Sequence, residues 1–127
     1  MKKLFSIIAA TLLLAGCSST GAAVNMSVDE FASKIAEPGV VLVDVRTPGE
    51  FMSGHIEGAI NIDFESGNFE NEINKLDKNI EYAIYCRSGN RSGQAAAIMH
   101  DAGFHKVSNL NAGIIDWTGS GMPLVYN

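Results

Sequence analysis

The stretch YCRSGNRSG, Tyr85 to Gly93, brings one cysteine together with two arginines, two glycines and three small polar residues. An apolar run precedes this stretch and an alanine-rich run follows it, which predicts a turn between a strand and a helix. The first N–H groups of a helix have no partner inside the helix, and the helix dipole adds partial positive charge. Anions bind readily at such a turn, so the stretch is a candidate anion site.

Cys86 is the nucleophile candidate in this turn. Cations and a helix N-terminus acidify a thiol, and the thiolate is its reactive form. No histidine base is needed in such a site, which separates it from a Cys–His protease. The groups expected to hold the anion are Arg87, Ser88, Gly89, Asn90, Arg91 and Ser92.

The first residues have the pattern of an export signal. MKK is followed by the apolar run LFSIIAATLLL, which is too short to span a bilayer, and then by LAGC, Leu14 to Cys17. This pattern resembles the bacterial lipobox, in which the cysteine is lipidated and the chain is cut before it; a plain signal peptide is the alternative. We therefore expect a lipoprotein signal peptide over residues 1–16, a lipidated tether over 17–26 and a folded domain over 27–127.

The resemblance to a lipobox has consequences for where the protein is located and for whether Cys86 can form a disulfide. It predicts a lipid-anchored protein of the bacterial cell envelope, facing the periplasm. Ser18 rather than aspartate follows Cys17, which favours the outer membrane of a Gram-negative host. The lipid would leave Cys86 unpaired where exported thiols are usually paired, and this favours a reactive role over that of a buried, inert cysteine.

Composition sets further limits. The chain has 127 residues, enough for one compact domain, and a formal net charge of −5. An acidic chain is a poor partner for nucleic acid, which binds to basic surfaces. No cluster of cysteine and histidine has metal-ligand spacing, so we expect neither a metal nor another cofactor.

Strand and helix patterns alternate after residue 26. Ser27 and Glu30 form a predicted capping box, and Pro48 is expected to start a short helical turn. Strands are expected over 40–45, 58–62, 81–86 and 105–110, and helices over 28–36, 68–76 and 92–103, with a turn or helix near 112–119. This alternation predicts an α/β fold, with a mainly parallel sheet covered by helices on both faces. Ligands bind such sheets beyond the carboxyl ends of the strands, where Cys86 is expected.

Three segments in the same order resemble the rhodanese family. They are VLVDVRTPGEFMSGHIEGAINI, the cysteine loop with GQAAAIMHDAGF after it, and NLNAGIIDW. The resemblance runs from about Ser27 to the end of the chain, and it departs from the family at Ala112, where a first glycine is usual. It implies a rhodanese-like fold and a thiosulfate sulfurtransferase-like enzyme. In that family the cysteine takes a sulfane sulfur from an anionic donor such as thiosulfate, forms a persulfide, and passes the sulfur to cyanide or a thiol.

Further functions remain open from the sequence. Tyrosine-type phosphatases also place a cysteine before an anion loop, but with five residues between cysteine and arginine; here four separate Cys86 from Arg91. A non-enzymatic binding module at the envelope, and a persulfide carrier that serves a protein acceptor, are two more candidate functions. Asp44 and Arg46 end the first buried strand and could line the site, but a structural polar network, together with Glu50, is favoured.

Overall fold

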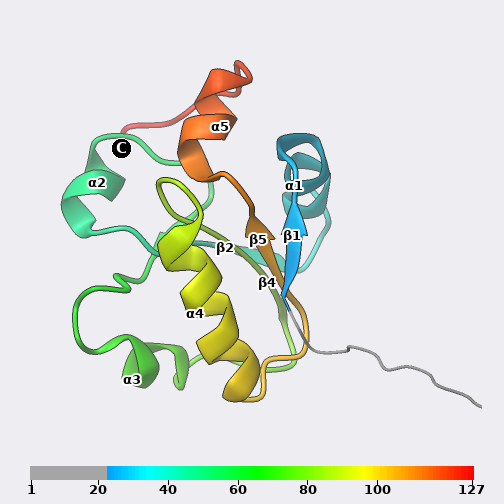
Figure 1. Cartoon of the computed structure of the whole chain (residues 1–127), viewed down its shortest axis with the longest axis vertical. Helices are drawn as coiled ribbons and strands as arrows, with labels where there is room; N and C mark the ends of the chain where they lie inside the picture. The colour runs from blue at the N-terminus through cyan, green and yellow to red at the C-terminus, as the bar shows by residue number, and fades with distance from the viewer. Residues whose placement is uncertain (1–22) are drawn as a thin grey trace, which may run out of the picture.

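The alternation of strands and helices is present in the computed structural model, which describes residues 23–127 (Figure 1). The strands are β1 (Val24–Met26), β2 (Val40–Asp44), β3 (Ile60–Asn61), β4 (Glu81–Tyr85) and β5 (Val107–Leu110). The helices are α1 (Val28–Ile35), α2 (Pro48–Met52), α3 (Phe69–Ile73), α4 (Asn90–Asp101) and α5 (Gly113–Gly119).

The five strands of the described chain form one parallel sheet in the order β1-β5-β4-β2-β3. β4 lies in the middle, with Tyr82 paired to Val41 on β2 and to Val107 on β5. A strand that is buried on both faces has a nearly continuous apolar sequence, as β2 and β4 do. Because all the strands run the same way, the loops that follow β2 and β4 meet at one edge of the sheet.

Helices cover both faces of this sheet, as the sequence predicts. One apolar cluster joins the sheet to α3 and α4, through residues such as Phe69, Ala96 and Met99. The other cluster joins the opposite face to α1 and α5, through Phe31 and Trp117. The two clusters bury the apolar residues of the central strands and hold the carboxyl edge of the sheet in place.

The edge strand β1 differs from the sequence prediction, which placed residues 17–26 in a tether. Val24–Met26 pairs in parallel with Ser108, Asn109 and Leu110 of β5. Asn109 Nδ2 also donates a hydrogen bond to Asn25 Oδ1, at 3.0 Å. Three residues with a polar one in the middle are too short a run to show a strand pattern, so only the pairing with β5 reveals that they belong to the sheet.

Helix α1 starts at the residue that the sequence predicts, whereas α4 starts earlier than predicted. The predicted capping box is present: Glu30 N donates to Ser27 Oγ, and Ser27 N donates to Glu30 Oε1. α4 begins at Asn90, two residues earlier than expected, because Gly89 adopts the left-handed conformation from which the helix starts.

The signal peptide, the lipobox and Cys17 lie outside the described residues, as does most of the tether. These assignments therefore stay predictions. Within residues 23–127, every helix is too short or too polar to cross a lipid bilayer.

Candidate active site

Cys86 directly follows β4, at the carboxyl edge of the sheet. Its side chain is 1% exposed and forms no disulfide. Gly89 N donates a hydrogen bond to the Sγ atom at 3.0 Å, and the buried Ser92 hydroxyl donates another at 3.3 Å. The sulfur therefore lies inside the turn, with donors directed at it.

These contacts favour the thiolate. Burial of the sulfur acts to raise the pKa of Cys86, because a charged group is less stable away from water. The Ser92 hydroxyl and the backbone N–H groups of Ser92, Gly89 and Ser88 act in the opposite direction and outweigh burial. The pKa of Cys86 is thus below its ordinary value, as expected for a nucleophilic cysteine.

Gly89 allows the turn to close around the sulfur. Its φ angle is +100°, and a Cβ atom at this position would overlap the Asn111 carbonyl. Any other residue would therefore meet both backbone strain and a clash. The loop after β5, which carries Asn111, thus packs directly on the cysteine loop.

The start of α5 fixes the other side of the turn. Gly113 has φ +72°, and a Cβ atom there would overlap the Arg87 carbonyl. Ile114 N donates to the Cys86 carbonyl at 2.9 Å, and Ile115 N donates to the Arg87 carbonyl at 3.2 Å. Ala112 has φ −106°, a conformation open to any residue, which explains why alanine replaces the family's usual first glycine there.

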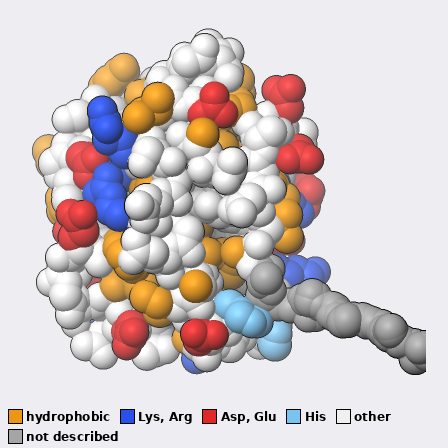
Figure 2. Space-filling model, in the orientation of Figure 1, with side chains coloured by type: hydrophobic (Ala, Val, Ile, Leu, Met, Phe, Trp, Pro, Cys, Tyr) orange, Lys and Arg blue, Asp and Glu red, His pale blue; other side chains and the backbone are white. Residues whose placement is uncertain are grey.

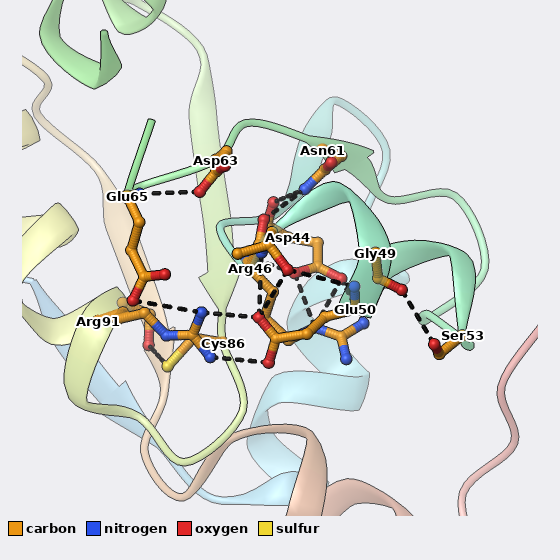
Figure 3. Close-up of polar contacts among 12 residues, drawn as sticks. Asp44, Arg46, Gly49, Glu50, Ser53, Asn61, Asp63, Glu65, Cys86 and Arg91 are labelled. Carbon is orange, nitrogen blue, oxygen red and sulfur yellow. Dashed lines mark hydrogen bonds and ion pairs between the residues drawn. The ribbon is translucent and has the colours of Figure 1, made fainter. Parts of the chain in front are cut away.

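Arg91 reaches from α4 to α2 and makes a two-pronged ion pair with Glu50 (Figure 3). Its Nη1 and Nη2 atoms lie 2.8 and 3.0 Å from the two Glu50 oxygens, and Glu65 lies 3.8 Å from Nη1. The hydrogen bonds from Arg91 lower the pKa of Glu50 from 4.5 to about 2, with a smaller contribution from Thr47. The positive charge predicted for the loop at Arg91 is therefore largely balanced by a carboxylate.

The predicted anion-holding residues do not all face the sulfur. Contacts come from the side chain of Ser92 and the backbone of Ser88, Gly89 and Ser92. Asn90 is exposed, and its side chain accepts a hydrogen bond from Gln94. Arg87 is also exposed and, among residues 23–127, makes no ion pair with a carboxylate.

Asp44 and Arg46 form a buried polar network behind the site. The fully buried Asp44 carboxylate accepts hydrogen bonds from Arg46 N, Nε and Nη2, and Arg46 Nη2 also donates to the Gly54 carbonyl at 2.7 Å. These contacts fit the structural role favoured from the sequence. The expectation that Glu50 joins this network is wrong, because its carboxylate is bound to Arg91 and to Thr47.

Two features of the site cannot be found in the sequence. Glu50 lies 41 residues before Arg91, and its position in a second capping box with Thr47 gives no indication of that partner. Gly113 belongs to a family motif, but its packing against Arg87 depends on the fold. In the described part of the chain, no group of three or more metal-binding side chains is close enough together to hold a metal ion.

Comparison with known proteins agrees with this geometry. Residues 27–120 match the rhodanese-like domain family. A sulfurtransferase of Allochromatium vinosum is 40% identical over 86 residues, which cover 68% of this chain and 78% of the relative. The thiosulfate:glutathione sulfurtransferase of Saccharomyces cerevisiae is 34% identical over 96 residues, covering 67% and 69%.

The fold has solved counterparts. The crystal structure of a rhodanese-related protein from Thermoplasma volcanium superposes with a TM-score of 0.73 at 26% identity, covering 82% of this chain and 99% of the other. A parallel sheet with a cysteine loop at its carboxyl edge, together with the family match, defines the class of protein. The chain belongs to the rhodanese family.

Proposed function

We propose that this chain is a sulfurtransferase that moves a sulfane sulfur from thiosulfate, or a similar anionic donor, to a thiophilic acceptor. The observation that carries the proposal is the Cys86 Sγ atom, buried and hydrogen-bonded to Gly89 N and the Ser92 hydroxyl. Relatives named as sulfurtransferases support the same chemistry. No cofactor enters the reaction.

The reaction consists of two displacements at sulfur. The Cys86 thiolate attacks the outer sulfur of thiosulfate, the sulfur–sulfur bond of the donor breaks, and sulfite leaves with the electron pair. The acceptor, cyanide or a thiolate, then attacks the outer sulfur of the persulfide and restores the Cys86 thiolate. The thiolate, the sulfite leaving group and the persulfide are all anionic, so one set of donors stabilises each of them.

The cationic residues have different parts in this mechanism. Arg91 adds positive charge near the thiolate but is held by Glu50, so it acts mainly on the electrostatics of the loop. Arg87 is exposed and unpaired among the described residues, so it is the stronger candidate to attract the donor from solvent. The smaller loop also favours sulfur transfer over phosphatase chemistry.

Mass spectrometry tests the proposal directly. Thiosulfate should add the mass of one sulfur atom to the wild-type chain, and cyanide should remove it. Cys86→Ser should gain nothing, because an unactivated serine hydroxyl is a poor nucleophile, whereas Cys17→Ala should load normally. Steady-state kinetics should give parallel double-reciprocal lines. A folded wild-type chain that gains no sulfur from any small donor would favour a binding module or scaffold instead.

We also propose that Cys17 carries a lipid that anchors the domain in the bacterial cell envelope. The support is the sequence LAGC after an apolar run. Labelled palmitate should enter the wild-type protein in cells, and Cys17→Ala should block both lipid attachment and cleavage. Absence of label from the wild-type protein would refute the anchor without bearing on the chemistry of Cys86.

A further inference from the structure

The arginines around the cysteine loop are mostly matched by carboxylates. In Figure 2, basic and acidic side chains lie next to each other on the left of the view, the side that α2 occupies in Figure 1. Arg46 is paired with Asp44, and Arg91 is paired with Glu50. Arg87 is exposed and makes no ion pair within residues 23–127. The loop, which the sequence predicts to be cationic, therefore has one unpaired arginine in the described part of the chain.

Glu65 adds a further carboxylate beside Arg91. It lies in the loop after β3, outside the three segments that resemble the rhodanese family. Its Oε2 atom is 3.8 Å from Arg91 Nη1, and its side chain is 54% exposed. Glu65 N donates a hydrogen bond to Asp63 Oδ1 at 2.8 Å, which holds the backbone that presents this side chain. In Figure 3, the Arg91 guanidinium lies between the Glu65 and Glu50 carboxylates. Because Glu50 already matches the charge of Arg91, the charge of Glu65 is in excess.

This excess charge lies within electrostatic reach of the sulfur. The hydrogen bonds with Glu50 contribute most to the raised pKa of Arg91, and the negative charges of Glu50, Cys86 and Glu65 add to the effect. Cys86 and Glu65 therefore act on the same guanidinium from their two positions. When Cys86 is ionised, its charge and that of Glu65 together outweigh the positive charge of Arg87.

An excess of negative charge distinguishes between sulfur donors of different charge. Thiosulfate carries two negative charges, whereas an alkyl thiosulfonate or an alkyl persulfide carries one. The Coulomb energy of a donor that approaches Glu65 is proportional to the charge of the donor. At physiological ionic strength such forces act over about 8 Å, so Glu65 needs no direct contact with the donor. A doubly charged donor is therefore repelled more strongly than a singly charged one.

We propose that Glu65 is a specificity-determining residue, which slows the loading of Cys86 from doubly charged donors relative to singly charged ones. The donor class that it selects is a sulfane sulfur compound with a single negative charge. This inference rests on the proposed sulfurtransferase function. With an alkyl thiosulfonate, the Cys86 thiolate attacks the outer sulfur, the sulfur–sulfur bond of the donor breaks, and a sulfinate leaves with the electron pair. Cys86 then carries the same persulfide that thiosulfate would give.

The test compares two donors that react in the same way but differ in charge. The full chain is mixed at low salt with thiosulfate or with methanethiosulfonate, and the gain of one sulfur atom is followed by rapid-quench mass spectrometry. The loading rate with thiosulfate, divided by that with methanethiosulfonate, should rise about threefold in Glu65→Gln, as expected for one exposed charge. Glu65→Lys changes the charge by twice as much and should raise this quotient about ninefold. Comparison with wild type cancels the intrinsic reactivity of the two donors.

Salt and a remote carboxylate separate the effect of charge from a change in structure. At about 1 M salt the Debye length falls to about 3 Å, so the difference between Glu65→Gln and wild type should disappear. An altered loop structure would keep its effect at high salt. Glu70→Gln is the matched control, because its exposed carboxylate makes no ion pair within the described residues and lies near Asp101, at the opposite end of α4 from Arg91. This variant should keep the wild-type quotient.

The possible results distinguish this inference from the proposed function. If the quotient in Glu65→Gln equals that of wild type at low salt, or if its change persists at high salt, the role of Glu65 is refuted and the proposed function stands. Equal changes in Glu65→Gln and Glu70→Gln would indicate an effect of the net charge of the whole protein and would also refute the role of Glu65. If neither donor loads the wild-type chain, the inference and the proposed function fail together.

Discussion

Replacing Glu50 with glutamine tests whether the ion pair with Arg91 stabilises the folded domain. Glutamine keeps the size of the side chain and can still accept the hydrogen bonds from Thr47, so the change removes mainly the charge. The pKa of Glu50 is lowered from 4.5 to about 2 in the folded chain. At about 1.4 kcal/mol per pH unit, this gap sets an upper bound of about 3 kcal/mol.

Solvent reduces that bound. The side chains of Glu50 and Arg91 are 29% and 20% exposed, so water screens part of their attraction. We therefore expect Glu50→Gln to lower the free energy of unfolding at pH 7 by about 1–2 kcal/mol. Because the folded pKa is lowered, this stabilisation is complete above pH 4.5 and is lost as the pH falls toward 2. The difference between wild type and variant should therefore shrink over the same range.

Urea unfolding at several pH values between 7 and 3 measures this difference. Trp117 is the only tryptophan of the chain and is 4% exposed, so its fluorescence reports unfolding. Glu72→Gln is the matched control, because its carboxylate lies 3.5 Å from Lys75 and both side chains are well exposed. That change should cost less than about 0.5 kcal/mol. Equal stability of Glu50→Gln and wild type at pH 7, or a difference that does not change with pH, would refute the reasoning.

Substitutions at two positions, Gly113 and Asp44, test the scaffold of the site, and a change at Ala112 is the control for the first. Gly113→Ala should lower the free energy of unfolding by more than about 2 kcal/mol and slow sulfur loading, because Gly113 has a positive φ and a Cβ atom there would overlap the loop backbone. Ala112→Gly is the control, and it should lower the free energy of unfolding by about 1 kcal/mol at most. Urea unfolding and the rate of sulfur loading distinguish the Gly113 and Ala112 variants. A Gly113→Ala chain with the stability of wild type would contradict the close packing of Gly113 against the Arg87 backbone. Asp44→Ala should leave Arg46 buried and unpaired and cost about 3 kcal/mol, with little change in turnover per folded molecule. A stable Asp44→Ala chain with turnover reduced about a thousandfold would make Asp44 a catalytic residue.

Local patterns in the sequence predict the fold and the position of the nucleophile. The apolar runs of β2 and β4 indicate buried strands, and the glycine-bearing turn after β4 indicates an anion site. Cys86 can be placed at the carboxyl edge of the sheet because parallel strands bring their ends together there. These features depend on residues that are close together in the chain.

The features that the sequence does not reveal depend on residues that are far apart. β1 is a strand only because β5 provides partners for its backbone. The charge of Arg91 is balanced by Glu50, which belongs to another element, and the cysteine loop is closed by the backbone around Gly113. Glu50 and Gly113 carry no local pattern that identifies the residues they contact in the cysteine loop. The number of free charges around the cysteine can therefore be known only from the fold.

The contacts between the cysteine loop and the start of α5 also determine when the site can exist. Asn111, Gly113, Ile114 and Ile115 hold the backbone of the loop in place, yet all of them follow Cys86 in the chain. A chain that has not yet folded has a thiol of ordinary acidity, because the hydrogen-bond donors around Cys86 are not yet assembled. The lowered pKa of Cys86 is thus a property of the completed fold and not of the loop sequence alone.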